Sequence, residues 1–245
     1  MCFNERRLFL KLGLIYAAIH LFLYIPMHVS YQEFFTGVPT GVQIALGIAV
    51  SVLAEIVNFA LPILSASVLF ISAAYRGVGH ALLRTWIFAL PCLVSAVPEN
   101  YLKYLYYTDS AGAIAASLIF SVLTAVIIAL EILVLFSVMY LSMRKKGEGG
   151  GISHVCASVE NDEIFNFSAP FTKALFSACL VAFAVRFISE SFNALSYLIS
   201  EAGAYRAREA LTIVFTYIFI TLLFLGTYVA AYKLKSKLLK NRLSR

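Results

Sequence analysis

Long stretches without a charged side chain most strongly limit what this chain can fold into. No Lys, Arg, Asp or Glu occurs between Lys11 and Glu33, or between Glu209 and Lys233. Each interval is longer than the roughly 20 apolar residues that a helix needs to cross a bilayer. Since 61% of the residues are hydrophobic and 13% are charged, the composition is that of a membrane protein rather than a soluble domain. The sequence therefore predicts a multi-pass membrane protein.

Four further apolar stretches complete the pattern, and two of them contain a single charged residue each, Glu55 and Glu131. The predicted fold class is all-α, a single membrane domain of residues 1–245. Its six transmembrane helices are expected at about 8–30, 42–75, 82–107, 111–143, 172–200 and 209–232. The segment 145–170 begins with a Gly-rich run and continues with mixed polar residues. We expect it to be a flexible cytoplasmic loop.

The distribution of Lys and Arg predicts the orientation, because cytoplasmic loops retain positive charge during insertion. With the N-terminus inside, 15 of the 19 basic residues fall on the cytoplasmic side or at its helix ends. Both termini are therefore expected in the cytoplasm, and the protein in the plasma (cytoplasmic) membrane. The basic tail that begins at Lys233 follows from the same rule. Its alternative interpretation is a patch for anionic lipid or nucleic acid, but no nucleic-acid partner is expected.

The basic residues that flank the predicted helices recur at near-regular spacing. The intervals from Lys11 to Arg76, from Arg84 to Lys146 and from Lys173 to Lys233 are 65, 62 and 60 residues. One interpretation is a tandem repeat of three two-helix hairpins, as in transporters built from duplicated units. The other is six independent helices with similar flanks, since the positive-inside rule alone gives this periodicity.

Polar and ionisable residues near mid-depth of the predicted helices are the strongest candidates for a substrate-binding or ion-binding site. A charge at the centre of a membrane helix costs about 2.5–3.5 kcal/mol on the insertion scale, so such residues are expected to face protein or water. Helical spacing places polar residues on one face of three helices. The candidate site residues are Glu55, Asn58, Glu131, Arg186, Glu190 and Asn193. An ion-pair cluster that fixes helix order is the alternative interpretation.

Four residues are weaker candidates for the same kind of site, namely His20, Glu99, Asn100 and Tyr104. A lone histidine on an apolar helix is more often packed or hydrogen-bonded than a ligand. Tyrosines near a membrane surface are ordinary interfacial anchors, although a dense group of them beside polar side chains could line an outer pocket.

Enzyme signatures are missing from the sequence. It contains no His-Glu-x-x-His, no Gly-x-Ser-x-Gly and no Walker loop, and no aspartate lies within a predicted helix. We therefore expect no enzymatic activity, no cofactor and no metal site, while a lipid-modifying enzyme that uses Glu and His stays open as an alternative. The four cysteines lack metal-ligand spacing and are expected to be free thiols.

Two function classes follow from these observations. The first is a permease, or the substrate-capturing subunit of a small-solute transporter, with a charged centre in the membrane. In architecture and size the predicted chain resembles the substrate-binding subunits of energy-coupling-factor vitamin transporters, a resemblance that implies partner membrane subunits. The helices at 42–75 and 111–143 are long for that architecture. The second class is a non-catalytic scaffold or assembly factor, which would recruit a membrane or cytoplasmic protein through helix faces and the 145–170 loop.

Overall fold

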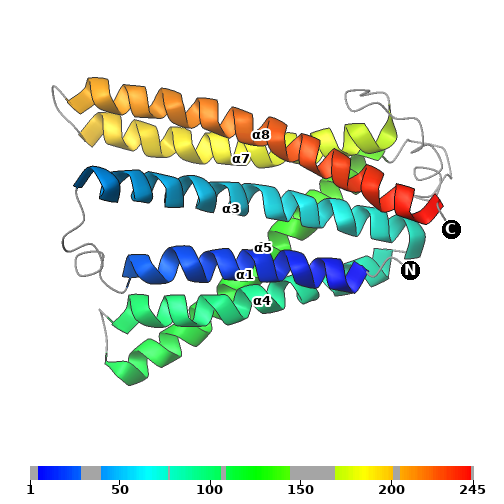
Figure 1. Ribbon diagram of the computed structural model, residues 1–245, viewed down its shortest axis with the longest axis horizontal. Coiled ribbons are helices and arrows are strands. Elements are labelled where there is room, and N and C mark those ends of the chain that lie inside the picture. Colours follow the sequence, from blue (N-terminus) through cyan, green and yellow to red (C-terminus); the bar gives the residue numbers. More distant parts are fainter. Residues whose placement is uncertain are drawn as a thin grey trace. The chain divides into compact units, whose positions relative to one another are not determined.

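The computed structural model describes residues 5–28, 40–76, 78–105, 109–143, 169–200 and 205–243. Over these residues the chain forms six α-helices and no strand, which confirms the predicted all-α class (Figure 1). The helices are α1 (Glu5–His28), α3 (Thr40–Arg76), α4 (Val78–Leu105), α5 (Ser110–Met143), α7 (Pro170–Ser200) and α8 (Tyr205–Leu243). The predicted loop at 145–170 lies outside the described residues up to residue 168.

Local sequence signals set where two of the helices begin. Asp109 is the N-cap of α5, since its Oδ1 accepts a hydrogen bond from the Gly112 amide at 2.9 Å and its carbonyl accepts one from the Ala113 amide. A side chain in this position satisfies an amide that has no partner within the helix. Helix α7 begins with Pro170, which has no N–H to satisfy and whose backbone angle suits a first turn.

Helix α8 is longer than the sequence predicts. The expected span was 209–232, whereas the helix runs from Tyr205 to Leu243. Charged residues mark where a chain leaves hydrocarbon, but Lys, Leu and Arg are good helix formers in water. The membrane boundary and the helix end are therefore different positions in this segment.

The chain divides into two compact units, Met1–Val134 and Leu135–Arg245. The first holds α1, α3, α4 and most of α5, and the second holds the end of α5 with α7 and α8. The contacts that follow are contacts within each unit. The predicted single domain and the threefold hairpin repeat therefore stay predictions.

In the first unit α1 packs closely against α4 (Figure 1). A Cβ added to Gly13 would lie 2.8 Å from the backbone oxygen of Phe88, so the contact needs a residue without a side chain. The Tyr16 and Phe88 rings meet edge to face, with their centroids 6.0 Å apart. Small residues allow such approach in membranes, where the surrounding lipid is as apolar as the helices and van der Waals packing favours association.

Small residues also form the core between α4 and α5. Ala89 of α4 is buried together with Ala125 and Ala129 of α5, and Leu93 packs against this cluster. Helix α3 contacts both α1 and α4, and most of its Glu55–Ala73 stretch is buried. The first unit is therefore a bundle in which α3 supplies much of the interior.

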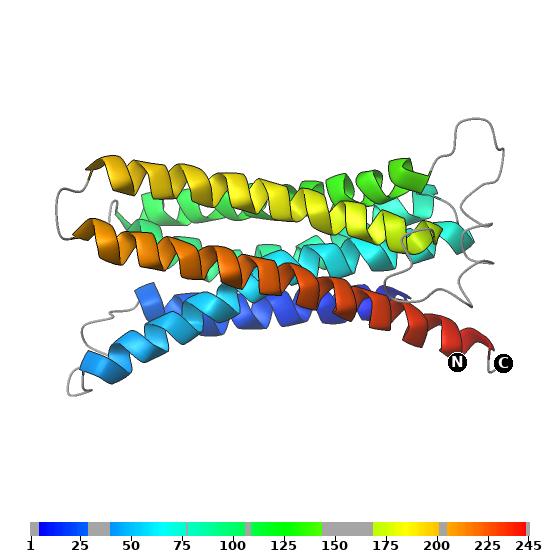
Figure 2. The ribbon, with the colours of Figure 1, turned by 90° about the horizontal axis from the view of Figure 1, so that it is seen from above.

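In the second unit α7 and α8 run antiparallel, side by side (Figure 2). Their contact is aromatic. Phe176 lies edge to face with Phe224 and Tyr228, with centroids 5.8 and 6.2 Å apart, and Phe183 meets Phe224 at 5.5 Å. Edge-to-face pairs are worth about 0.5–1.5 kcal/mol each beyond their buried area. Contacts between aromatic rings thus stabilise the α7–α8 pair, whereas α1 and α4 approach closely at a glycine.

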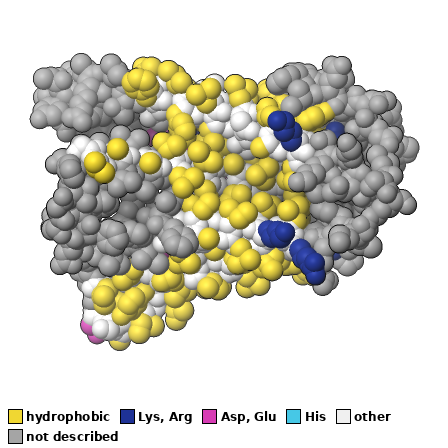
Figure 3. Space-filling view, viewed as in Figure 1, with side chains coloured by type: hydrophobic (Ala, Val, Ile, Leu, Met, Phe, Trp, Pro, Cys, Tyr) yellow, Lys and Arg dark blue, Asp and Glu magenta, His cyan; other side chains and the backbone are white. Residues whose placement is uncertain are grey.

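Four of the described helices contain stretches long and apolar enough to cross a membrane. They are Glu55–Ala73, Ser110–Met143, Pro170–Phe192 and Val214–Lys235. Hydrophobic side chains cover much of the described surface in the view of Figure 3. Exposed apolar area of this extent is uncommon in soluble monomers and is typical of a surface that faces lipid. The chain is therefore a membrane-embedded protein.

The contact at Gly13 generates a direct test. Gly13→Ala should lower the free energy of unfolding by about 1–3 kcal/mol, because the added methyl group meets backbone that cannot move aside. Gly226→Ala is the matched control, since a Cβ at this helical position meets nothing within 4 Å. Thermal unfolding can be followed with a thiol-reactive fluorophore, because Cys92 and Cys179 are buried in the folded protein. Equal midpoints for the two variants would contradict the close α1–α4 contact.

Candidate functional site

The first part of the predicted site lies on α3, in the first unit. Glu55 and Asn58 are half-buried and nearly one turn apart, while Val57 and Phe59 beside them are buried. Pro62 follows one turn later, inside the helix. A proline cannot donate the N–H that the carbonyl four residues earlier would accept, so the backbone of α3 offers one donor fewer at this level. A carboxylate, an amide and a carbonyl are groups that accept a proton or bind a cation.

Glu131 lies on an exposed part of α5. The buried face of this helix carries Ser117, Ser121, Ile128 and Ile132, and Glu131 lies beside it on the outward side. The polar residues that helical spacing places together on α5 therefore differ in burial, because they cover a wider arc of the helix than its buried face does. Two of its serines are buried, and Glu131 is an exposed residue.

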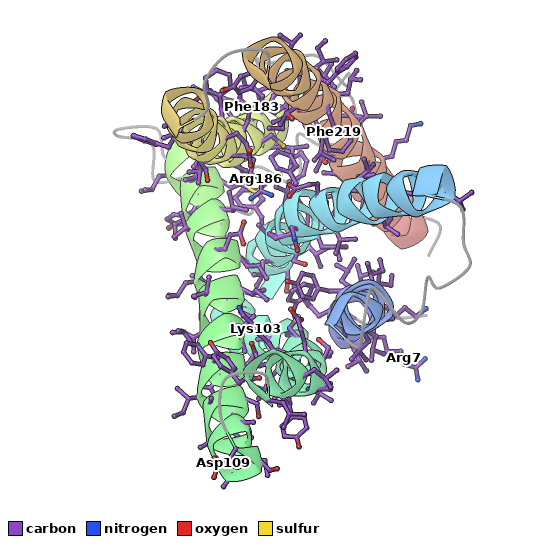
Figure 4. The ribbon with its side chains drawn as sticks, turned by 90° about the vertical axis from the view of Figure 1, so that its left-hand side faces the viewer. Arg7, Lys103, Asp109, Phe183, Arg186 and Phe219 are labelled. Atoms are coloured by element: carbon purple, nitrogen blue, oxygen red, sulfur yellow. The ribbon has the colours of Figure 1, made fainter. Side chains whose placement is uncertain are left out.

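The second part of the site lies on α7, in the second unit. Arg186 and Glu190 are half-buried and one turn apart, inside the apolar stretch Pro170–Phe192. Figure 4 shows Phe183 and Arg186 projecting from α7, and Phe219 from α8. A spacing of one turn would let the glutamate neutralise the arginine within the helix, and this pairing stays a prediction.

Aromatic and hydroxyl groups surround this pair of charges. The Phe187 ring lies 4.7 Å from the Tyr217 ring of α8 and 5.8 Å from the Phe183 ring. The hydroxyls of Ser191 and Tyr217 form a hydrogen bond of 2.7 Å between the two helices. Charged, hydroxyl and aromatic groups therefore meet in one region of the α7–α8 pair.

The C-terminal end of α4 has a structural role. Asn100 Nδ2 donates to Ser121 Oγ of α5 at 3.1 Å, and the Tyr104 ring stacks on Phe120 with centroids 4.8 Å apart. Lys103 Nζ lies 5.8 Å from the centre of the Tyr104 ring, within range of a cation–π contact. Asn100 and Tyr104 thus join α4 to α5, and Glu99 is half-buried beside them.

Two candidates have side chains outside the described residues. His20 belongs to α1 and Asn193 to α7, and only their backbone is described. In the first unit lie Glu55, Asn58 and Glu131, and in the second lie Arg186 and Glu190. A single charged centre made by all of them stays a prediction.

Sequence reasoning missed two buried basic residues, Arg84 and Lys235. It treated both only as residues that flank predicted helices. Arg84 is 7% exposed, and its Nη1 donates to Ser72 Oγ of α3 at 3.1 Å. Lys235 is 2% exposed, with Nζ 4.6 Å from the centre of the Phe171 ring and 5.3 Å from that of Tyr232. Only the spacing of Tyr232 and Lys235, one turn apart on α8, pointed to part of this arrangement.

The described residues contain no group of three His, Cys, Asp or Glu side chains that could hold a metal ion. No protein-family model, curated protein or solved structure matches the chain. The function must therefore be argued from the site itself.

The hydrogen bond between α4 and α5 can be measured by a double-mutant cycle of Asn100→Ala and Ser121→Ala. Hydrogen bonds between membrane helices average about 0.6 kcal/mol, with a maximum near 1.7. We expect a coupling free energy in this range from unfolding in mixed detergent. A coupling of zero would show that Asn100 does not support helix packing and would return it to the candidate binding residues.

Proposed function

We propose that this chain crosses the plasma membrane six times with both termini in the cytoplasm. The orientation follows from the 15 basic residues that it places inside. Crossings by α1 and α4 are supported by their exposed faces. On α4 these are Leu83, Trp86, Leu90 and Val94, at helical spacing, and on α1 they are Leu10, Leu14 and Ile15. Such faces suit lipid.

Labelling with a membrane-impermeant maleimide tests this topology. Cys92 and Cys179 are buried, so Cys2 and Cys156 are the thiols expected to react, and only in inverted membrane vesicles. Lys103→Cys provides the opposite case, because Lys103 is exposed and is placed outside. It should react in intact cells. Labelling of Cys156 in intact cells would reverse or break the proposed topology.

We propose further that the protein is a permease, or the substrate-capturing subunit of one, for a small solute. The observation that carries this proposal is the position of Glu55, Arg186 and Glu190, half-buried within apolar helices. Ionisable residues are costly in a membrane, and those that persist commonly mark substrate or ion pathways. The outward-facing apolar residues around them are compatible with lipid and need no other explanation.

Glu55→Gln should abolish solute accumulation without loss of folded protein, because the amide removes a charge and a proton acceptor at nearly constant volume. The measurement is mass spectrometry of the solutes that energised right-side-out vesicles accumulate, with folded yield determined by size-exclusion chromatography. Glu131→Gln makes the same change at an exposed residue of α5. It should also abolish accumulation if the two glutamates belong to a single charged centre, and leave it unchanged if the site is on α3 alone. A Glu55→Gln variant that accumulates every solute like the wild type would contradict the permease proposal.

A scaffold is the second candidate, and one observation favours it. Glu131 lies on a face of α5 where Ile127, Leu130 and Val134 are each 55% exposed. An acid on a face as apolar as this one is uncommon towards lipid, and a second polypeptide packed on the face would cover both the acid and its apolar neighbours. The same measurement distinguishes the two candidates. A scaffold predicts that Glu55→Gln lowers the folded yield and that no solute depends on the protein.

A further inference from the structure

Helix α5 has an exposed apolar face that is longer than a bilayer is thick. Its stretch Ser110–Met143 is more apolar than the other three described stretches that could cross a membrane, and Glu131 is its only charged residue. Exposed apolar side chains occur along it from Ile114, which is 52% exposed, to Leu141, which is 62% exposed. At the rise of an α-helix these two residues are about 40 Å apart along the axis. The hydrocarbon core is only about 30 Å thick.

Helix α4 belongs to the same unit and has an exposed face of shorter length. Its exposed apolar residues extend from Leu83 through Leu90 and Val94 to Leu105, which is about 33 Å along the axis. A face of this length fits the hydrocarbon core when the helix lies close to the membrane normal. The face of α5 fits the same core only when the helix is tilted.

The direction of α5 agrees with its length. Figure 4 looks along α1 and α4, which are seen almost end-on, whereas the part of α5 that belongs to the first unit is seen from the side. A face of about 40 Å fits a layer of about 30 Å when its helix is tilted by about 40°. This angle is at the upper end of the tilts found among membrane helices. The inclination of α5 to α4 therefore matches both faces to one bilayer.

The contact between α4 and α5 allows this angle to change. Ala89 of α4 packs with Ala125 and Ala129, near the middle of α5. Methyl groups form shallow ridges, so they limit the crossing angle less than long side chains do. The hydrogen bond from Asn100 to Ser121 lies between this crossing and the connection that joins the two helices. The opposite ends of α4 and α5 can therefore separate while this bond is kept.

Helix α4 is not free to tilt in the same way. It packs closely against α1, where Gly13 meets the backbone of Phe88, and it also contacts α3. Packing against neighbouring helices sets the tilt of a membrane helix, so α4 keeps the direction of these three helices. A change in bilayer thickness should therefore alter the angle between α5 and α4.

We propose that α5 responds to the thickness of the bilayer. The partner of its exposed face is the layer of lipid acyl chains, and its angle to α4 increases as this layer becomes thinner. Acyl chains fit the face because its exposed side chains are almost all apolar and because tilting is a usual response of an apolar helix that is too long for its bilayer. Since α5 continues into the second unit beyond Val134, the change reaches that unit along the helix. This response requires only a membrane-embedded chain and is independent of the permease function.

Distances between spin labels, measured by pulsed electron paramagnetic resonance, test this response. The full-length protein is reconstituted in phosphatidylcholine with myristoleoyl, oleoyl or erucoyl chains, which gives three bilayers of increasing thickness. Labels at Gly79→Cys of α4 and Val134→Cys of α5 are at exposed positions, on the side of the crossing away from the connection. Their mean distance should be about 2–4 Å longer in the thinnest bilayer than in the thickest, because the helix ends separate as the angle increases.

A second pair of labels is the control, in the same background with Cys2 and Cys156 replaced by Ser. Leu14→Cys of α1 and Leu83→Cys of α4 are also exposed, and their distance should be the same in all three lipids. A constant distance between α4 and α5 would overturn the proposal and indicate that a polypeptide covers the face or that the bilayer deforms instead. Equal changes in the two pairs would also overturn it, since they would reflect a general deformation of the protein.

A variant with a shorter apolar face links the response to its cause. Ile114→Gln combined with Leu141→Gln limits the exposed apolar residues to 118–134, about 24 Å of helix, which is less than the thickness of the hydrocarbon core. This variant should lose most of the change in distance between Gly79→Cys and Val134→Cys. An undiminished change in folded variant, as judged by size-exclusion chromatography, would show that the length of the α5 face is not the cause. If the variant does not fold, the wild-type series in the three lipids still decides.

Discussion

The high cost of placing charge in hydrocarbon underlies the arrangement of this protein. The stretches without charge set the length of the apolar helical segments. Most of the few ionisable residues within these segments are partly buried. Glu55, Arg186 and Glu190 are half-buried, whereas Lys103 at the C-terminal end of α4 is exposed.

Helix association in such a chain cannot rely on the exclusion of water, and the two units solve this problem with different side chains. The first brings backbones together at Gly13 and at the alanines of α4 and α5. The second fills the space between its helices with rings, among them Phe183 and Phe224. Both solutions depend on shape complementarity, since lipid competes equally well for a loose apolar surface. A helix pair lined by rings also retains polar groups such as Ser191 and Tyr217 between them.

The sequence predicts the helices well because its strongest signal, the spacing between charges, is a one-dimensional property. It underestimates α8, since a helix that leaves the membrane meets no signal to stop at Lys233. The site is less predictable because it depends on which face of each helix is covered. Glu131 and Ser117 are only about 40° apart around α5, but only the serine is buried. Asn100 shows the same limit, since its partner lies 21 residues away on another helix.

The unbroken length of α8 gives the protein a mechanical property. With 39 residues the helix is about 58 Å long, roughly twice the thickness of the hydrocarbon core. It contains no proline between Tyr205 and Leu243, so the commonest cause of a sharp kink is missing from it. A small rotation of α8 at Tyr217 would therefore turn its far end, beyond Lys235, through the same angle. In this way α8 can connect movements among the aromatic rings with whatever its C-terminal end touches.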